Sequence, residues 1–174
     1  MRTLPIALLL SLTLTAAAHD FWIRPADFAP PIDAVLAVHL RVGDHARGEP
    51  VPRKDDRLVR FVAVDADGSR EIVGRDGTLP AGALRTRGVG VTTLAYHSTP
   101  AFLELPPERF EAYLREEGLE AVVAERRASG ESQRPGRERY ERCCKALVQV
   151  GGEGRGGGAT LGLPLEWIVV GDPF

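Results

Sequence analysis

The sequence predicts a mainly β domain of the α+β class that carries one helical insert. Runs of alternating apolar and polar residues, the pattern of half-buried strands, occur toward both ends of the chain. Helical spacing of apolar residues, with a period near 3.6, occurs at residues 110–123, within an insert that we place around residues 107–142. The chain has 174 residues, 44% of them hydrophobic and 26% charged. This balance is typical of a globular domain and excludes a disordered chain or a coiled coil.

The first strand is expected over residues 34–42, AVLAVHLRV. Leu36, Val38, Leu40 and Val42 alternate with other residues, so they are predicted to face a core. His39 falls between them and is therefore expected on the more solvated face of the strand.

A β-hairpin and three later strands complete the β prediction. Residues 58–65, LVRFVAVD, read as a strand, and the sequence Ala-Asp-Gly-Ser at 66–69 is typical of a hairpin turn. The chain is expected to return through residues 70–73. Later alternating runs predict strands at 91–98, 145–150 and 163–170.

The proline pair at residues 106 and 107 follows the strand predicted at 91–98 and predicts the start of the helical insert. Pro107 suits the first turn of a helix, and Glu108 complements the positive end of its dipole. Two apolar stripes follow, each with the spacing i, i+3 and i+4. The first is Phe110, Tyr113 and Leu114, and the second, after Gly118, is Leu119, Val122 and Val123. We therefore expect two short helices.

The first eighteen residues have the features of a signal peptide. Arg2 gives a positive start, residues 4–14 are apolar, and small residues at 15–18 suit a cleavage site. The apolar run is too short to span a bilayer comfortably. We therefore expect residues 1–18 to be removed, leaving residues 19–174 as one periplasmic or secreted domain with no membrane insertion.

Several classes of function are disfavoured by composition and motifs. The formal charge of -2 provides no basic field for nucleic acid. HExxH, GxSxG and the Rossmann glycine pattern are all missing, so the sequence favours a binding protein over an enzyme. Cys143 and Cys144 are adjacent, which provides no disulfide framework, and we interpret them as two small residues before a strand.

Cleavage after Ala18 would make His19 the N-terminal residue. Its α-amine, with a reference pKa of ~7.7–8.0, and its ring Nδ1 would then chelate one metal ion. A second histidine, either His39 or His97, would complete a three-nitrogen histidine brace suited to Cu or Ni. The alternative is that all three are ordinary surface histidines.

A charged group before the last predicted strands permits two interpretations. It would either bind an anionic ligand or form an ion-pair network that connects the helical insert to the sheet. We favour the ion-pair network. Its members are Arg137, Glu138, Tyr140, Arg142 and Lys145.

Several motifs in one order resemble a known family: AHDFWIRPADFAP, GEPVPR, FEAYLREEGLEAV, RERYERCCKALVQVG and LGLPLEW…GDP. The chain resembles domain-of-unknown-function family 4198, exported bacterial proteins often labelled as the periplasmic component of a cobalt or nickel transport system. The resemblance implies an immunoglobulin- or transthyretin-like antiparallel β-sandwich with a helical insert, and a link to metal and to a membrane transport complex. Only His19 matches a family position with metal chemistry.

Two departures from that family bear on stability. Family members continue past the GDP segment, so the domain is expected to be incomplete at its C-terminus, with an exposed edge strand. Cys143-Cys144 replaces an expected aromatic and small residue.

The leading expectation is an exported protein that captures a divalent transition metal ion (Ni, Co or Cu) through His19 for uptake. A carbohydrate- or protein-binding β-sandwich without metal is the alternative. A copper oxidoreductase with a histidine brace is disfavoured, because Trp22 and Trp167 are the only tryptophans available for a flat substrate face.

Overall fold

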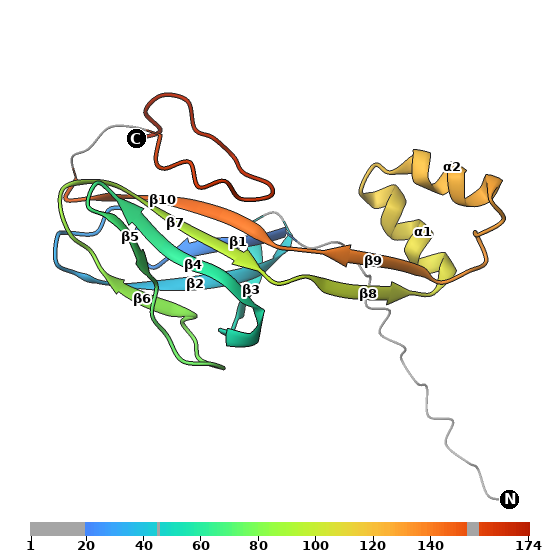
Figure 1. Cartoon of the computed structure of the whole chain (residues 1–174), viewed down its shortest axis with the longest axis horizontal. Helices are drawn as coiled ribbons and strands as arrows, with labels where there is room; N and C mark the ends of the chain where they lie inside the picture. Colours follow the sequence, from blue (N-terminus) through green and yellow to red (C-terminus); the bar gives the residue numbers. More distant parts are fainter. Residues whose placement is uncertain (1–19, 45, 153–156) are drawn as a thin grey trace, which may run out of the picture. The chain divides into compact units, whose positions relative to one another are not determined.

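The computed structural model describes residues 20–44, 46–152 and 157–174 (Figure 1). Within the described residues, Leu105–Gly136 form one compact unit, the helical unit, and the rest form the β unit. The strands are antiparallel and predominate over two helices, which confirms the predicted mainly β class.

One sheet of the β unit, sheet A, is built around β2. It contains β1 (Asp20–Pro25), β2 (Val35–Asp44), β3 (Arg47–Val51) and β6 (Gly82–Arg85). The order is β1-β2-β3, and β6 also pairs with β2. Phe21 lies opposite Val42, and Arg24 lies opposite His39.

The second sheet, sheet B, has the order β10-β7-β4-β5. It contains β4 (Leu58–Asp65), β5 (Gly68–Glu71), β7 (Gly90–Ser98) and β10 (Cys143–Val150), and the 3-10 helix η1 (Asp55–Arg57) precedes β4. The predicted hairpin is confirmed as β4 and β5. Gly68 allows its turn, since its φ of 106° is a conformation that other residues rarely adopt.

The core lies between the two sheets, which face each other as a β-sandwich (Figure 1). Leu36, Val38 and Leu40 of β2 are buried, as their alternation predicted, whereas Val42 is only half-buried. Leu94 and Val148 of sheet B are completely buried among them. The alternation places His39 on the outer face of sheet A.

The chain enters and leaves the helical unit through a two-stranded ribbon of β8 (Ala101–Leu105) and β9 (Gly136–Tyr140). Between them lie α1 (Pro107–Glu116) and α2 (Glu120–Ala128). Gly136 is required beside the small core of this unit, because a Cβ there would lie 2.0 Å from the Phe110 ring.

The predicted insert extended to residue 142, but its helical part ends at Ala128. Residues 136–140 form strand β9 instead. The charged sequence Arg-Glu-Arg-Tyr has no helical apolar stripe, and pairing with β8 determines its conformation.

The prediction of a last strand at residues 163–170 is wrong. The C-terminal segment, residues 157–174, contains no strand and lies over the outer face of sheet B (Figure 1, red). Its backbone is held by side chains rather than by a neighbouring strand. The Ala159 N–H donates to Thr93 Oγ1 at 2.8 Å, and the Leu161 N–H donates to Glu166 Oε1 at 2.7 Å.

Candidate functional site

One end of the sandwich brings together the start of β1, the end of β7 and the start of β10. The Phe21 ring lies 5.1 Å from the Tyr96 ring. The Arg142 guanidinium stacks over Phe21 at 4.8 Å and over Tyr140 at 5.4 Å. These stacked groups fix the start of β1 against sheet B.

His97 lies at this end, on the outer face of β7, with Tyr96 beside it facing the core. Its Nε2 is 2.8 Å from Glu141 Oε2, and the other oxygen of Glu141 lies 3.3 Å from Arg139 Nη2. When Nε2 carries the proton and donates it to Glu141, Nδ1 is left as the ring atom able to accept a hydrogen bond or bind a metal. Sequence reasoning missed Glu141 and Arg139.

His39 lies elsewhere, opposite Arg24 in the middle of β2. Burial, with further contributions from Arg41 and Arg24, lowers the pKa of His39. The start of β1 is four residue pairs away, or about 13 Å at ~3.3 Å per residue. His39 and His97 occupy outer faces of opposite sheets, so the structure does not bring them together around one ion.

The predicted chelating residue, His19, lies outside the described residues, as do His45 and the predicted signal peptide, residues 1–18. In residues 20–44, 46–152 and 157–174, no group of three or more His, Cys, Asp or Glu side chains is arranged to hold a metal ion. The same residues include no helix of the length and apolarity needed to cross a membrane.

The structure divides the predicted charged group rather than joining it. Arg137 lies 3.3 Å from Glu104, and both side chains are exposed. Arg142 stacks on aromatic rings, and Lys145 points away from the ribbon to Glu166. These side chains therefore have separate partners, because successive strand residues point to opposite faces.

Lys145 and Glu166 instead clamp the C-terminal segment to sheet B. Their side chains are 2.8 Å apart and only 10% and 7% exposed. The Glu166 carboxylate also accepts hydrogen bonds from the N–H groups of Leu161, Gly162 and Leu163. The Lys145 ammonium and these N–H groups outweigh desolvation and lower the pKa of Glu166 to about 2.

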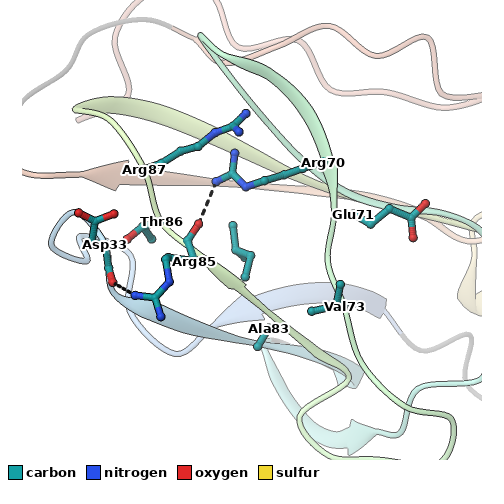
Figure 2. Close-up of a pocket in the computed structure, with 9 residues that line it drawn as sticks. Asp33, Arg70, Glu71, Val73, Ala83, Arg85, Thr86 and Arg87 are labelled. Carbon is teal, nitrogen blue, oxygen red and sulfur yellow. Dashed lines mark hydrogen bonds between the residues drawn. The ribbon is translucent and has the colours of Figure 1, made fainter.

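A shallow pocket of about 350 Å³ lies beside β5 and β6 and contains three arginines (Figure 2). Arg70 and Arg87 both pair with the buried carboxylate of Asp65. Burial opposes ionisation, but hydrogen bonds from Arg87 and Arg70 lower the pKa of Asp65. Arg85 donates to the Asp33 carbonyl at 2.6 Å. These guanidinium groups are paired with acceptors of the same chain, so we interpret the pocket as part of the folded structure rather than as a ligand-binding site.

The two cysteines point to opposite faces of β10, and both are free thiols. Cys144 packs against the core, and burial, with Cys143 nearby, raises its pKa to about 12. Cys143 lies on the outer face opposite His97.

We expect iodoacetamide at neutral pH to label one cysteine of the folded chain, Cys143, because alkylation requires an accessible thiolate. Peptide mass spectrometry would locate the label. Cys143→Ser is expected to abolish labelling and Cys144→Ser to leave it unchanged. Equal labelling of both thiols would contradict the packing of Cys144 against the core.

Comparison with known families identifies one match along nearly the whole chain. The family described as a domain of unknown function, DUF4198, matches residues 16–174. No curated protein and no solved structure matches the chain. Since the match covers far more than half of the sequence, the chain belongs to the DUF4198 family.

Proposed function

We propose that this protein is an exported binding protein that captures a divalent transition metal ion (Ni, Co or Cu) at the end of the sandwich where β1 begins. The ligands would be the α-amine and ring of His19, as the mature N-terminus, together with Nδ1 of His97. The observation that carries the proposal is the hydrogen bond of 2.8 Å between His97 Nε2 and Glu141.

That hydrogen bond matches the usual environment of a metal-binding histidine. Such a histidine commonly donates its second ring N–H to a carboxylate, which fixes the tautomer and makes the ligating nitrogen more basic. Arg139 in turn holds Glu141. Phe21 is stacked against sheet B, so β1 begins at the end of the sandwich that carries His97. His39 has no place in this proposal.

An amine and two imidazoles form a set of nitrogen donors that suits Cu(II) and Ni(II). We assign capture and delivery rather than catalysis, with a membrane transport complex as the acceptor of the metal. The copper oxidoreductase alternative would require a second histidine beside His19 and a flat aromatic face, for which Trp22 and Trp167 are the only tryptophans in the sequence. A carbohydrate- or protein-binding module is the function that remains if no metal binds.

The proposal is tested by calorimetric titration of Cu(II) and Ni(II) into a chain beginning at His19 and into a chain with one alanine added before it. The added residue moves the free amine away from the imidazole of His19. We expect it to weaken binding at least about 100-fold, or about 2.7 kcal/mol.

Substitutions at His97 and Glu141, the two residues of the proposed site that the structure describes, test their contribution to metal affinity. His97→Ala is expected to weaken binding, and Glu141→Gln to weaken it by about 10–100-fold. His39→Ala is the matched control and is expected to leave the affinity unchanged. Equal binding by the two N-terminal forms, or no binding by either, would overturn the metal proposal.

A further inference from the structure

Cys143 and Cys144 have different surroundings, although they are adjacent in the sequence. Cys144 packs against the core, whereas Cys143 lies on the outer face of β10. The sequence contains only these two cysteines, and both are free thiols. The interpretation of the pair as small residues before a strand therefore accounts for Cys144 and leaves the choice of a cysteine at position 143 unexplained.

Cys143 and His97 lie directly opposite each other on the paired strands β10 and β7. Residues opposite each other in an antiparallel pair point to the same face of the sheet, with Cβ atoms ~4.5–5.5 Å apart. On its other side His97 lies opposite Arg60 of β4, whose guanidinium donates to the Leu161 carbonyl at 3.0 Å. Of the two neighbours of His97 across the sheet, Cys143 is therefore the one with a metal-binding side chain.

The hydrogen bond between His97 and Glu141 places a metal ion on the side of the imidazole that is nearer to Cys143. Glu141 occupies Nε2, which leaves Nδ1 as the ligating nitrogen. Nδ1 is the ring nitrogen nearer to the backbone, so an ion bound to it lies close to the surface of the sheet. Bonds of ~2.0–2.1 Å to nitrogen and ~2.3 Å to sulfur, the lengths at zinc sites, allow one ion to bridge such a cross-strand pair.

We propose that the Cys143 thiolate is a further ligand of the ion bound by His97, an inference that rests on the proposed function. The thiol releases its proton to solvent and one metal–sulfur bond forms, with no change in oxidation state. Together with the amine and ring of His19, the site then has three nitrogen donors and one sulfur donor. Because thiolates are soft ligands, Cys143 selects transition metal ions against Mg²⁺, Ca²⁺ and Mn²⁺, which prefer oxygen donors.

The test is an anaerobic titration of Co(II) into the chain beginning at His19, followed by its absorption spectrum. A cobalt–thiolate bond produces a charge-transfer band in the near ultraviolet, which nitrogen and oxygen ligands do not. Cys143→Ser keeps the size of the side chain and is expected to remove this band. It should also weaken Co(II) binding at least about tenfold, the lower end of the effect of losing an outer-shell partner. Cys144→Ala is the matched control and is expected to keep both the band and the affinity.

Alkylation provides a second measurement, with Ni(II) as the probe. A thiolate bound to a metal ion is no longer a free nucleophile. We therefore expect saturating Ni(II) to protect Cys143 from iodoacetamide in the wild-type chain. His97→Ala is expected to reduce this protection at the same Ni(II) concentration, because the ion loses the ligand opposite Cys143.

The outcomes separate this inference from the proposed function. Tight Co(II) binding without a thiolate band, or with unchanged affinity in Cys143→Ser, would overturn the role of Cys143 and leave the proposed function standing. A band and an affinity that are unchanged by one alanine added before His19 would have the opposite meaning, because the amine would then not be a ligand. A wild-type chain that binds neither Co(II) nor Ni(II) would overturn both.

Discussion

Replacing Leu94 by alanine is expected to lower the free energy of unfolding of the β unit by about 2–5 kcal/mol. Leu94 is completely buried in β7, between β4 and β10, and packs into the core shared by the two sheets. The truncation removes buried methyl groups and leaves a cavity that the close-packed sandwich fills only in part.

Urea denaturation followed by tryptophan fluorescence would measure this effect. Val59→Ala is the matched control, because Val59 lies on the neighbouring strand β4 but is 57% exposed. We expect the control to change stability by less than about 0.5 kcal/mol. Similar losses in the two variants would contradict the position of Leu94 in the core.

Acid is expected to release the C-terminal segment from sheet B. The folded state lowers the pKa of Glu166 from its ordinary value of 4.5 to about 2, chiefly through Lys145. A lowered carboxyl pKa stabilises the fold fully above the ordinary value, and this contribution disappears as the pH falls from about 4.5 through about 2. The clamp should therefore hold at neutral pH and weaken progressively across that acid range.

Hydrogen exchange at Leu161, Gly162 and Leu163 would report the clamp directly, because their N–H groups donate to Glu166. Glu166→Gln is expected to speed exchange of these amides about tenfold at neutral pH and to remove the acid dependence. Glu71→Gln, at an exposed position on β5, is the control. Unchanged exchange in Glu166→Gln would show that the carboxylate does not hold the segment.

The elements predicted well are those that local periodicity determines. β2 and the hairpin of β4 and β5 follow from alternation within a few residues, and α1 follows from the spacing of Phe110, Tyr113 and Leu114. Residues 163–170 are rich in apolar and β-branched residues, yet they form no strand. A strand requires a partner, and the pattern of a single segment contains no information about whether a partner is present.

The candidate site was less predictable because it depends on strand register. His97 and Glu141 are 44 residues apart and meet only because β7 pairs with β10. His39 looked equivalent to His97 in the sequence, since both lie between inward-facing residues of a strand. The choice between them depends on which sheet and which end of the sandwich each strand occupies.

Because the chain enters and leaves the helical unit through the paired strands β8 and β9, the unit resembles an insertion that could be deleted or replaced. The chain leaves the β unit at Glu104 and returns at Arg137, where the two side chains meet at 3.3 Å. Excising residues 105–136 would leave two adjacent chain ends that a short turn can join, with the strands of both sheets untouched. The same position can accept a foreign domain, so evolution or an engineer can exchange what the sandwich carries while its core stays the same.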